Sequence, residues 1–165
     1  MTAAVLVMCA EAVEFRFLAV DGRIAEIALA DPAASITIMP SEAGGEFLSL
    51  AATIVWSTVK NPSAAHVYLA VLPVPRGSLE EFDAWFIEEH GPMVSRAQHW
   101  VSAMLCTVPN GLYSRIGVHL LDDLAAMDSE ERRVAGATPW TQEVMAADWS
   151  AGIQRFVGSR HEARI

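Results

Sequence analysis

The chain has 165 residues, enough for one domain or one domain with an extension, and its hydrophobic fraction of 53% can supply a sizeable core. A net charge of −9, with Lys60 as the single lysine, repels phosphate backbones and anionic lipids, so we expect neither nucleic acid nor a membrane surface as a partner. No apolar run reaches the roughly 18–20 residues that a membrane-spanning helix needs.

The two cysteines and the amino terminus bear on the compartment. Cys9 and Cys106 lie in apolar, strand-like runs, where we expect buried free thiols, and such thiols suit a reducing cytoplasm. The amino terminus lacks the basic region of a signal peptide, so we expect a cytoplasmic protein. Neither cysteine belongs to a CxxC motif or to a Cys/His cluster, so we expect no metal site.

Residues 1–64 are predicted to form a β-rich segment. Asp21-Gly22 is typical of a tight hairpin turn between two of its strands. Gly44-Gly45 precedes an apolar stretch that fits either a helix or a strand. Strands are predicted over residues 3–8, 13–20, 23–30 and 35–39.

The most informative stretch is a helix predicted over residues 79–90. Ser78 and Glu81 have the spacing of a capping box at its start, and Gly91-Pro92 is expected to end it. A histidine stands at the end of a wide aromatic stripe, where a core or a ligand cavity would be. The apolar face carries, at helical spacing, Leu79, Phe82, Trp85, Phe86 and His90.

The order of elements after the break at Asn61-Pro62-Ser63 predicts the fold. Ser129 and Thr138, the latter followed by Pro139, are predicted to begin further helical stretches. Strands are predicted over residues 66–74, 99–108, 115–121 and 153–157. The resulting order, β-α-β-β-α-β, is the ferredoxin-like plan, an α+β fold whose antiparallel sheet carries both helices on one face.

The second face of such a sheet needs a cover. Alternation predicts that Trp100 and Met104 share one face of their strand and that Gly117 and His119 share one face of the next, with apolar residues on both faces of the sheet. A second copy of the chain, giving a homodimer, is the simplest cover. Residues 1–64 are either a reduced second ferredoxin-like unit or a β-rich extension that covers the sheet. We predict two domains, 1–64 and 65–165.

The stretch Glu81-Phe-Asp-Ala-Trp-Phe-Ile-Glu-Glu-His-Gly-Pro92 resembles the first helix of the EthD-like branch of the dimeric α+β barrel superfamily. Residues 125–130 and 137–141 are similar to its second-helix region, so the resemblance covers residues 66–158 and leaves 1–64 uncovered. It implies a homodimer whose sheets close a barrel, with a cavity between sheet and helices. Related proteins include enzymes that act without metal or organic cofactor on aromatic or polyketide-like compounds, lactone isomerases and haem-degrading monooxygenases.

Two histidines are the candidate catalytic residues. His90 beside a cavity could act as general acid or base at neutral pH, and its apolar neighbours are expected to lower its pKa. The alternative is a histidine that caps the helix end or bonds to backbone. His119 could face the same cavity and pair with His90, or it could be a hydrogen-bonded core histidine.

Five side chains are candidate ligand-binding residues. Trp85 and Phe86 would wall the cavity, although aromatic residues at this spacing also suit a core. Met104 is a candidate because of its position on the predicted strand 99–108. Arg115 could hold a ligand carboxylate or lie solvated at the rim, and Trp140 could be an interface residue or a lid over the cavity.

Three functional hypotheses follow. The first is a small cofactor-independent enzyme that transfers a proton on an apolar carbonyl-bearing or aromatic metabolite in the barrel cavity. The second is a non-catalytic or stress-associated barrel that holds a small hydrophobic molecule, and the third is haem binding through an axial histidine. An enclosed cavity above about 300 Å³ facing both histidines would favour the first. Nucleotide binding and serine hydrolase chemistry have no motif to support them.

Overall fold

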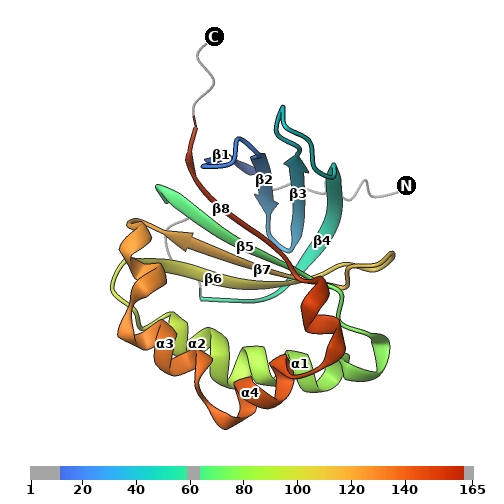
Figure 1. Cartoon of the computed structure of the whole chain (residues 1–165), viewed down its shortest axis with the longest axis vertical. Coiled ribbons are helices and arrows are strands. Elements are labelled where there is room, and N and C mark those ends of the chain that lie inside the picture. The colour runs from blue at the N-terminus through green and yellow to red at the C-terminus, as the bar shows by residue number, and fades with distance from the viewer. Residues whose placement is uncertain (1–11, 59–63, 162–165) are drawn as a thin grey trace, which may run out of the picture.

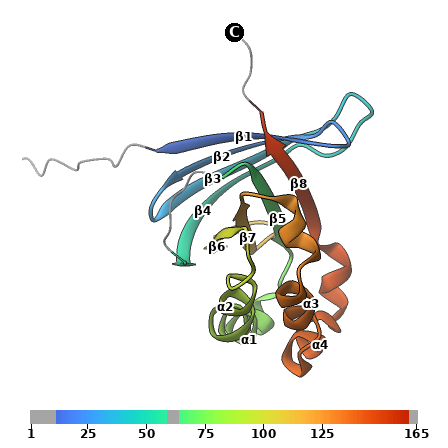
Figure 2. The same cartoon turned by 90° about the vertical axis from the view of Figure 1, so that its left-hand side faces the viewer.

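A computed structural model describes residues 12–58 and 64–161 and shows an α+β fold (Figures 1 and 2). Its antiparallel strands form one closed barrel in the order β1-β2-β3-β4-β6-β7-β5-β8. The helices cover only the outside of the half formed by β5 to β8 (Figure 2). In these two ranges no helix is long and apolar enough to cross a membrane.

The carboxyl-terminal half has the predicted ferredoxin-like plan. Its strands lie in the order β6-β7-β5-β8, so β5 and β7, the first and third in the chain, are the central strands. Helical segments follow each of these two strands in the sequence. The strands are β5 His66–Leu72, β6 Trp100–Thr107, β7 Arg115–Leu121 and β8 Gln154–Arg160. The helical segments are η1 Arg76–Ser78, α1 Leu79–Trp85, η2 Phe86–His90, α2 Gly91–Val94, η3 Leu124–Asp128, α3 Glu130–Gly136, α4 Pro139–Met145 and η4 Asp148–Gly152.

The amino-terminal half is an antiparallel meander that closes the barrel. Its strands are β1 Val13–Ala19, β2 Ile24–Ala30, β3 Ala33–Met39 and β4 Leu48–Ser57. β1 pairs with β8 and β4 pairs with β6, so both edges of the ferredoxin-like sheet are occupied. The apolar stretch after Gly44-Gly45 is therefore a strand, whereas the strand predicted over residues 3–8 lies outside the described residues.

Between the two alternatives for this segment, the structure has the β-rich extension that covers the sheet. Residues 12–58 contain strands but no helix, so a reduced ferredoxin-like unit is not what they form. The barrel joins strands from both sides of residue 64, and the division into domains 1–64 and 65–165 stays a prediction. The turn at Asp21-Gly22 is confirmed, because Gly22 has a φ of 87° and donates its N–H to Ala19 O.

The sheet face that we expected a second copy to cover is buried inside this barrel. Phe17 from β1, Ile36 from β3 and Val118 from β7 are all fully buried in one hydrophobic cluster. The predicted homodimer interface through that face is therefore wrong, because strands β1 to β4 of the same chain cover it. A homodimer stays a prediction, and its interface would have to use another surface.

The helix that carries the aromatic stripe differs from its prediction at both ends. Ser78 makes no side-chain cap, because a 3₁₀ turn leads directly into α1 and holds Ser78 at φ −109° and ψ −1° rather than in the extended conformation of an N-cap. Gly91-Pro92 does not end the helix either. Gly91 N–H donates to Phe86 O, five residues back, which closes a π-helical turn that ends at His90. The short helix α2, which contains Pro92, then continues to Val94.

Gly91 has a packing role instead of a terminating one. A Cβ atom at this position would lie 2.5 Å from the ring of Trp56, so only glycine lets this indole approach the helix. Trp56 belongs to β4, where an irregularity in the pairing with β6 falls between Ile54 and Trp56. The amino-terminal meander thus also contributes a side chain to the helix layer, where Trp56 meets Phe86 edge to face at 5.7 Å.

The two later helix starts are as predicted. Ser129 accepts a hydrogen bond from the backbone N–H of Arg132 at the start of α3. Thr138 accepts one from the backbone N–H of Thr141 at the start of α4, and Pro139 follows it. These caps fix the two helices that complete the cavity described next.

Candidate functional site

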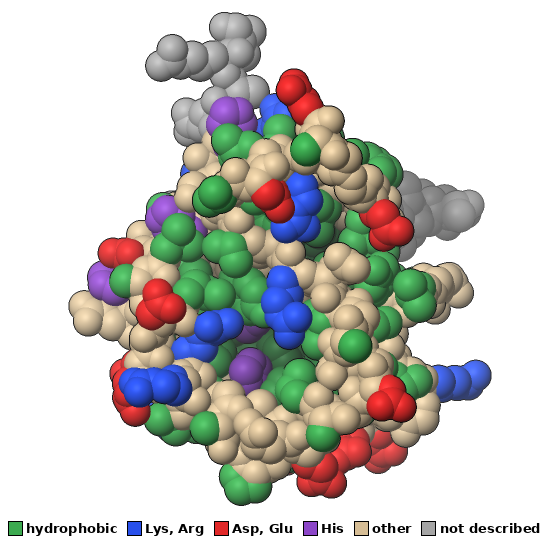
Figure 3. All heavy atoms as spheres, viewed as in Figure 1, with side chains coloured by type: hydrophobic (Ala, Val, Ile, Leu, Met, Phe, Trp, Pro, Cys, Tyr) green, Lys and Arg blue, Asp and Glu red, His purple; other side chains and the backbone are tan. Residues whose placement is uncertain are grey.

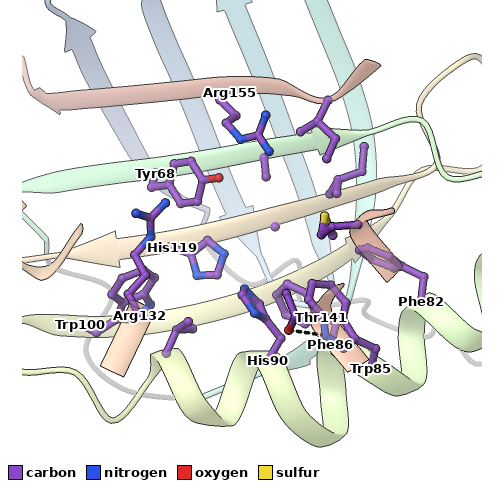
Figure 4. Close-up of a pocket in the computed structure, with 16 residues that line it drawn as sticks. Tyr68, Phe82, Trp85, Phe86, His90, Trp100, His119, Arg132, Thr141 and Arg155 are labelled. Carbon is purple, nitrogen blue, oxygen red and sulfur yellow. Dashed lines mark hydrogen bonds between the residues drawn. The ribbon is translucent and has the colours of Figure 1, made fainter. Parts of the chain in front are cut away.

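A cavity of about 130 Å³ lies between the helix layer and the outer face of β5, β7 and β8. The space-filling view shows it as a hollow in the surface, with histidine inside it and basic side chains beside it (Figure 3). Figure 4 shows the residues around it. Its walls include the aromatic and histidine side chains of Tyr68, Phe82, Trp85, Phe86, His90 and His119.

His90 lies at the end of the π-helical turn and points into the cavity from the helix layer (Figure 4). Its ring stacks on Trp85 with centroids 4.5 Å apart and lies 5.7 Å from Phe86. Its Nδ1 is buried and has no hydrogen-bond partner among the described residues. Burial, and secondarily the charge of Arg132, lower the pKa of His90 to about 4, so the imidazole is neutral at pH 7.

His119 faces it from β7 (Figure 4). The ring is stacked against Tyr68 at 5.5 Å, meets Trp100 edge-on at 5.2 Å, and lies 6.0 Å from Phe86. Its Nδ1 also lacks a partner in the part of the chain that the structure describes. Burial lowers the pKa of His119 to about 3, with smaller contributions from His90 and Arg132.

Gly117 provides the space in front of His119. The two residues lie on the same face of β7, as alternation predicted, and both line the cavity. A Cβ atom at Gly117 would lie 3.2 Å from Nε2 of His119 and 3.5 Å from the ring of Phe86. The absent side chain therefore leaves Nε2 of His119 next to open space rather than to packed carbon.

Trp85 and Phe86 line the cavity and are also nearly fully buried, so they wall the site and belong to the core at once. The indole N–H of Trp85 donates to Thr141 Oγ1 at 3.0 Å (Figure 4). Thr141 in turn donates to Ala135 O at 2.7 Å. This chain of hydrogen bonds holds the indole, and with it the stacked ring of His90, against α4.

Three predicted ligand-binding residues do not line this cavity. Met104 lies in the barrel interior, on the opposite face of the sheet. The guanidinium of Arg115 makes two hydrogen bonds of 2.7 Å to the carboxylate of Asp83 on α1, so it joins sheet to helix. Trp140 packs half-buried against the helix-side hydrophobic cluster.

The misplacement of Met104 has a specific cause. A β-bulge between Trp100 and Ser102 shifts the pairing of β6 with β7 by one residue. Trp100 therefore faces the helices and the cavity, whereas Met104 faces the barrel interior, and the two do not share a face as simple alternation predicted.

Sequence reasoning missed several lining residues, among them Tyr68, Trp100, Arg132 and Arg155. Tyr68 is the cross-strand partner of His119. Trp100 lies at the site because the bulge in β6 places its side chain on the helix side of the sheet. Arg132 on α3 and Arg155 on β8 line the cavity as well. The register of β5 against β7 could have placed Tyr68 beside His119. Arg132 stands in a polar run and Arg155 in a short predicted strand, and arginine side chains in either context are ordinarily solvated.

Neither a metal centre nor a reactive thiol emerges from the described side chains. Residues 12–58 and 64–161 hold no group of three or more His, Cys, Asp or Glu side chains that could bind a metal ion. Cys106 is buried in the barrel, and burial raises the pKa of its thiol to about 12. The polar groups that line the cavity are imidazole, hydroxyl and guanidinium groups.

No family model matches the sequence, and no curated protein matches it either. Solved structures do resemble it. A ferredoxin-fold protein of Listeria monocytogenes related to antibiotic biosynthesis monooxygenases shares 8% identity at a TM-score of 0.59, over 90% of this chain and 80% of that one. The heme-degrading enzyme LmHde of the same organism shares 9% identity at a TM-score of 0.54, over 88% of this chain and 83% of that one. An anthrone oxidase-like protein shares 11% identity at a TM-score of 0.53, over 90% of this chain and 76% of that one.

At such identities the likeness shows the fold alone. It confirms the ferredoxin-like plan. It gives no support to the EthD-like branch in particular.

Proposed function

We propose that the cavity binds a small aromatic or unsaturated molecule with a carbonyl group and transfers a proton on it. One observation carries the proposal: two neutral imidazoles, His90 and His119, share one aromatic-walled cavity, and neither buried Nδ1 is held by a hydrogen bond to the described chain. Buried polar groups are ordinarily paired, and exceptions concentrate where a ligand or a reaction uses them.

The two rings suit complementary roles. Because Nδ1 of both rings is shut away, Nε2 is the nitrogen that we assign to the ligand. His90 as base would take a proton from the carbon next to the carbonyl, and His119 would donate one to the carbonyl oxygen, which turns the ketone into its enol. The reverse transfers return the ketone and restore both rings, so the cycle needs no other reactant.

The size of the cavity limits the ligand. Its volume of about 130 Å³ is below the 300 Å³ expected for a full ligand pocket. A cavity of about 150 Å³ in another protein holds benzene, so this one suits a single ring, with any substituent extending through the opening. A polyketide-sized substrate is therefore not part of the proposal.

Binding without catalysis is the second candidate. The pKa values of about 4 for His90 and about 3 for His119 favour it, because general bases work best with a pKa near the working pH. In this alternative the neutral rings serve only to make the cavity both polar and uncharged. The two candidates differ in whether ligand protons exchange with solvent.

Haem, named for one similar structure, does not fit the residues present. Ligands of drug size already occupy pockets of roughly 300–1,000 Å³, and this cavity has about 130 Å³ between packed aromatic walls. We propose instead a cofactor-independent reaction of EthD-like type, in a protein that forms a homodimer.

The test is deuterium exchange at the benzylic carbon of phenylacetone, followed by proton NMR in D₂O. We expect the protein to accelerate exchange over buffer, and His90→Gln to lower the protein-dependent rate by about 100-fold or more while phenylacetone still binds. His119→Gln should also slow exchange. His99→Asn is the matched control, since His99 lies outside the cavity and asparagine tolerates its φ of 70°.

Three outcomes separate the candidates. Accelerated exchange that needs His90 supports the enzyme. Binding of phenylacetone without exchange supports the binding protein. Exchange that survives both glutamine substitutions would place the chemistry elsewhere and contradict the proposal.

A further inference from the structure

The cavity has a charged mouth that the proton-transfer proposal does not use. Arg132 extends from α3 and Arg155 from β8, and both line the same cavity as the two imidazoles. Figure 4 shows their guanidinium groups on the sheet side of the site, with Tyr68 between them. Two segments remote in sequence thus bring two cations to one opening.

Both guanidinium groups keep N–H donors that a ligand could use. Arg132 uses one N–H on Met127 O at 2.8 Å, out of the five that a guanidinium carries. Within residues 12–58 and 64–161, no carboxylate forms an ion pair with Arg132 or Arg155. Four other arginines do pair with acidic side chains: Arg16, Arg23, Arg115 and Arg133.

In the described part of the chain, no acidic side chain lines the cavity beside the two cations. None of the described residues that line the cavity is Asp or Glu, although the whole chain carries 20 acidic residues and a net charge of −9. The imidazoles of His90 and His119 are neutral at pH 7 and add no charge of their own. A positive opening in an acidic protein is a site that concentrates small anions.

Tyr68 orients one of these groups. The guanidinium carbon of Arg132 lies 5.6 Å from the centre of the Tyr68 ring, in cation–π contact, and Tyr68 itself stacks on His119. The planar fork of Arg132 is thereby held beside the catalytic candidate rather than left free in solvent. Such a fork binds a carboxylate through paired hydrogen bonds.

We propose that the ligand is a small aromatic carboxylate, whose ring enters the cavity and whose carboxylate is held at the opening by Arg132 and Arg155. This inference rests on the proposed function for the existence of the binding site, and it adds the substrate class. The ring lies among Trp85, Phe86 and Tyr68, and the charged group lies where the opening meets solvent.

The experiment compares benzoate with benzamide, which has the same ring and nearly the same shape but no charge. Binding to the full chain is followed by NMR line broadening of each compound and by calorimetry. We expect benzoate to bind at least tenfold more tightly than benzamide at low salt, and 0.5 M NaCl to reduce this preference. Arg132→Gln and Arg155→Gln should each lower benzoate affinity at least fivefold and leave benzamide affinity unchanged.

Arg133→Gln is the control, because Arg133 follows Arg132 on the same helix, pairs with Glu130 and does not line the cavity. Melting temperatures verify that each variant folds, and the salt dependence of the wild type gives an answer that needs no variant. Equal binding of benzoate and benzamide, or a benzoate preference that survives both substitutions, would overturn the carboxylate inference while leaving the proposed function intact. Failure of both compounds to bind the wild type would instead refute the ligand site itself.

Discussion

The indole of Trp85 and the imidazole of His90 are stacked with ring centroids 4.5 Å apart and planes inclined by 27°. Trp85 is nearly fully buried and hydrogen-bonded to Thr141, so it is a fixed surface on which His90 rests. The same contact removes water from one side of the imidazole. It connects the packing of the helix layer with the protonation state of the candidate base.

Trp85→Ala should therefore both destabilise the protein and release His90. Loss of a buried tryptophan side chain costs about 3–5 kcal/mol of unfolding free energy. The pKa of His90 should rise from about 4 toward its ordinary 6.5 as water enters the vacated space. Urea denaturation measures the first effect and NMR titration of the imidazole the second. A loss below about 1 kcal/mol would mean that the indole is not part of the core.

Thr141→Val tests the hydrogen bond that positions Trp85. The substitution keeps the shape of the side chain but leaves the buried indole N–H without its acceptor and Ala135 O without the hydroxyl donor, which should cost about 1–3 kcal/mol of unfolding free energy. Thr141→Ser keeps the hydroxyl and should cost less. If valine and serine variants unfold at the same urea concentration, the indole bond contributes nothing to stability.

The two low histidine pKa values predict how stability depends on pH. In the unfolded chain both imidazoles take up protons near pH 6.5, whereas in the folded protein they do so only near pH 4 for His90 and pH 3 for His119. Between these limits the unfolded state binds more protons, so stability is fully present above pH 6.5 and falls as the pH is lowered. Each histidine should account for about 2 kcal/mol between pH 7 and pH 5.

Urea denaturation at several pH values measures this slope. The double variant His90→Gln, His119→Gln should lose most of it above pH 5, where few carboxylates titrate. A wild-type stability that is flat from pH 7 to pH 5 would show that the imidazoles are not buried in the neutral form.

Arg115→Gln should destabilise the protein without affecting ligand binding. The substitution breaks two hydrogen bonds to Asp83 and leaves that carboxylate without its partner, at a cost of about 1–3 kcal/mol because Asp83 is partly exposed to water. Arg115→Lys, which keeps the charge but not the fork, should fall between. A variant that keeps its stability but loses benzoate affinity would return Arg115 to the ligand-binding role that its sequence context suggested.

Local chemistry explains what the sequence predicted correctly. Ser129 and Thr138 were recognised as helix starts because a helix start depends on residues within one turn. Gly117 and His119 were placed on one face because β7 is regular along its whole length.

Non-local packing explains what was missed. The bulge that separates Trp100 from Met104 is an event of strand pairing, and no pattern within β6 marks it. Gly91 looked like a helix end because its contact with Trp56 joins residues remote in sequence. Arg132 lies at the cavity because its guanidinium group contacts the ring of Tyr68, a residue remote from it in sequence.

Long-range ¹H–¹⁵N NMR spectra of the histidine imidazoles report the protonation state and the tautomer of each ring, and they measure directly whether two neutral imidazoles face one ligand. We expect His90 and His119 both to be neutral at pH 7, and phenylacetone to shift the Nε2 signals of both. A pKa of His90 above about 7.5, well over its ordinary value of 6.5, or rings that do not respond to phenylacetone, would contradict the proposed proton transfer.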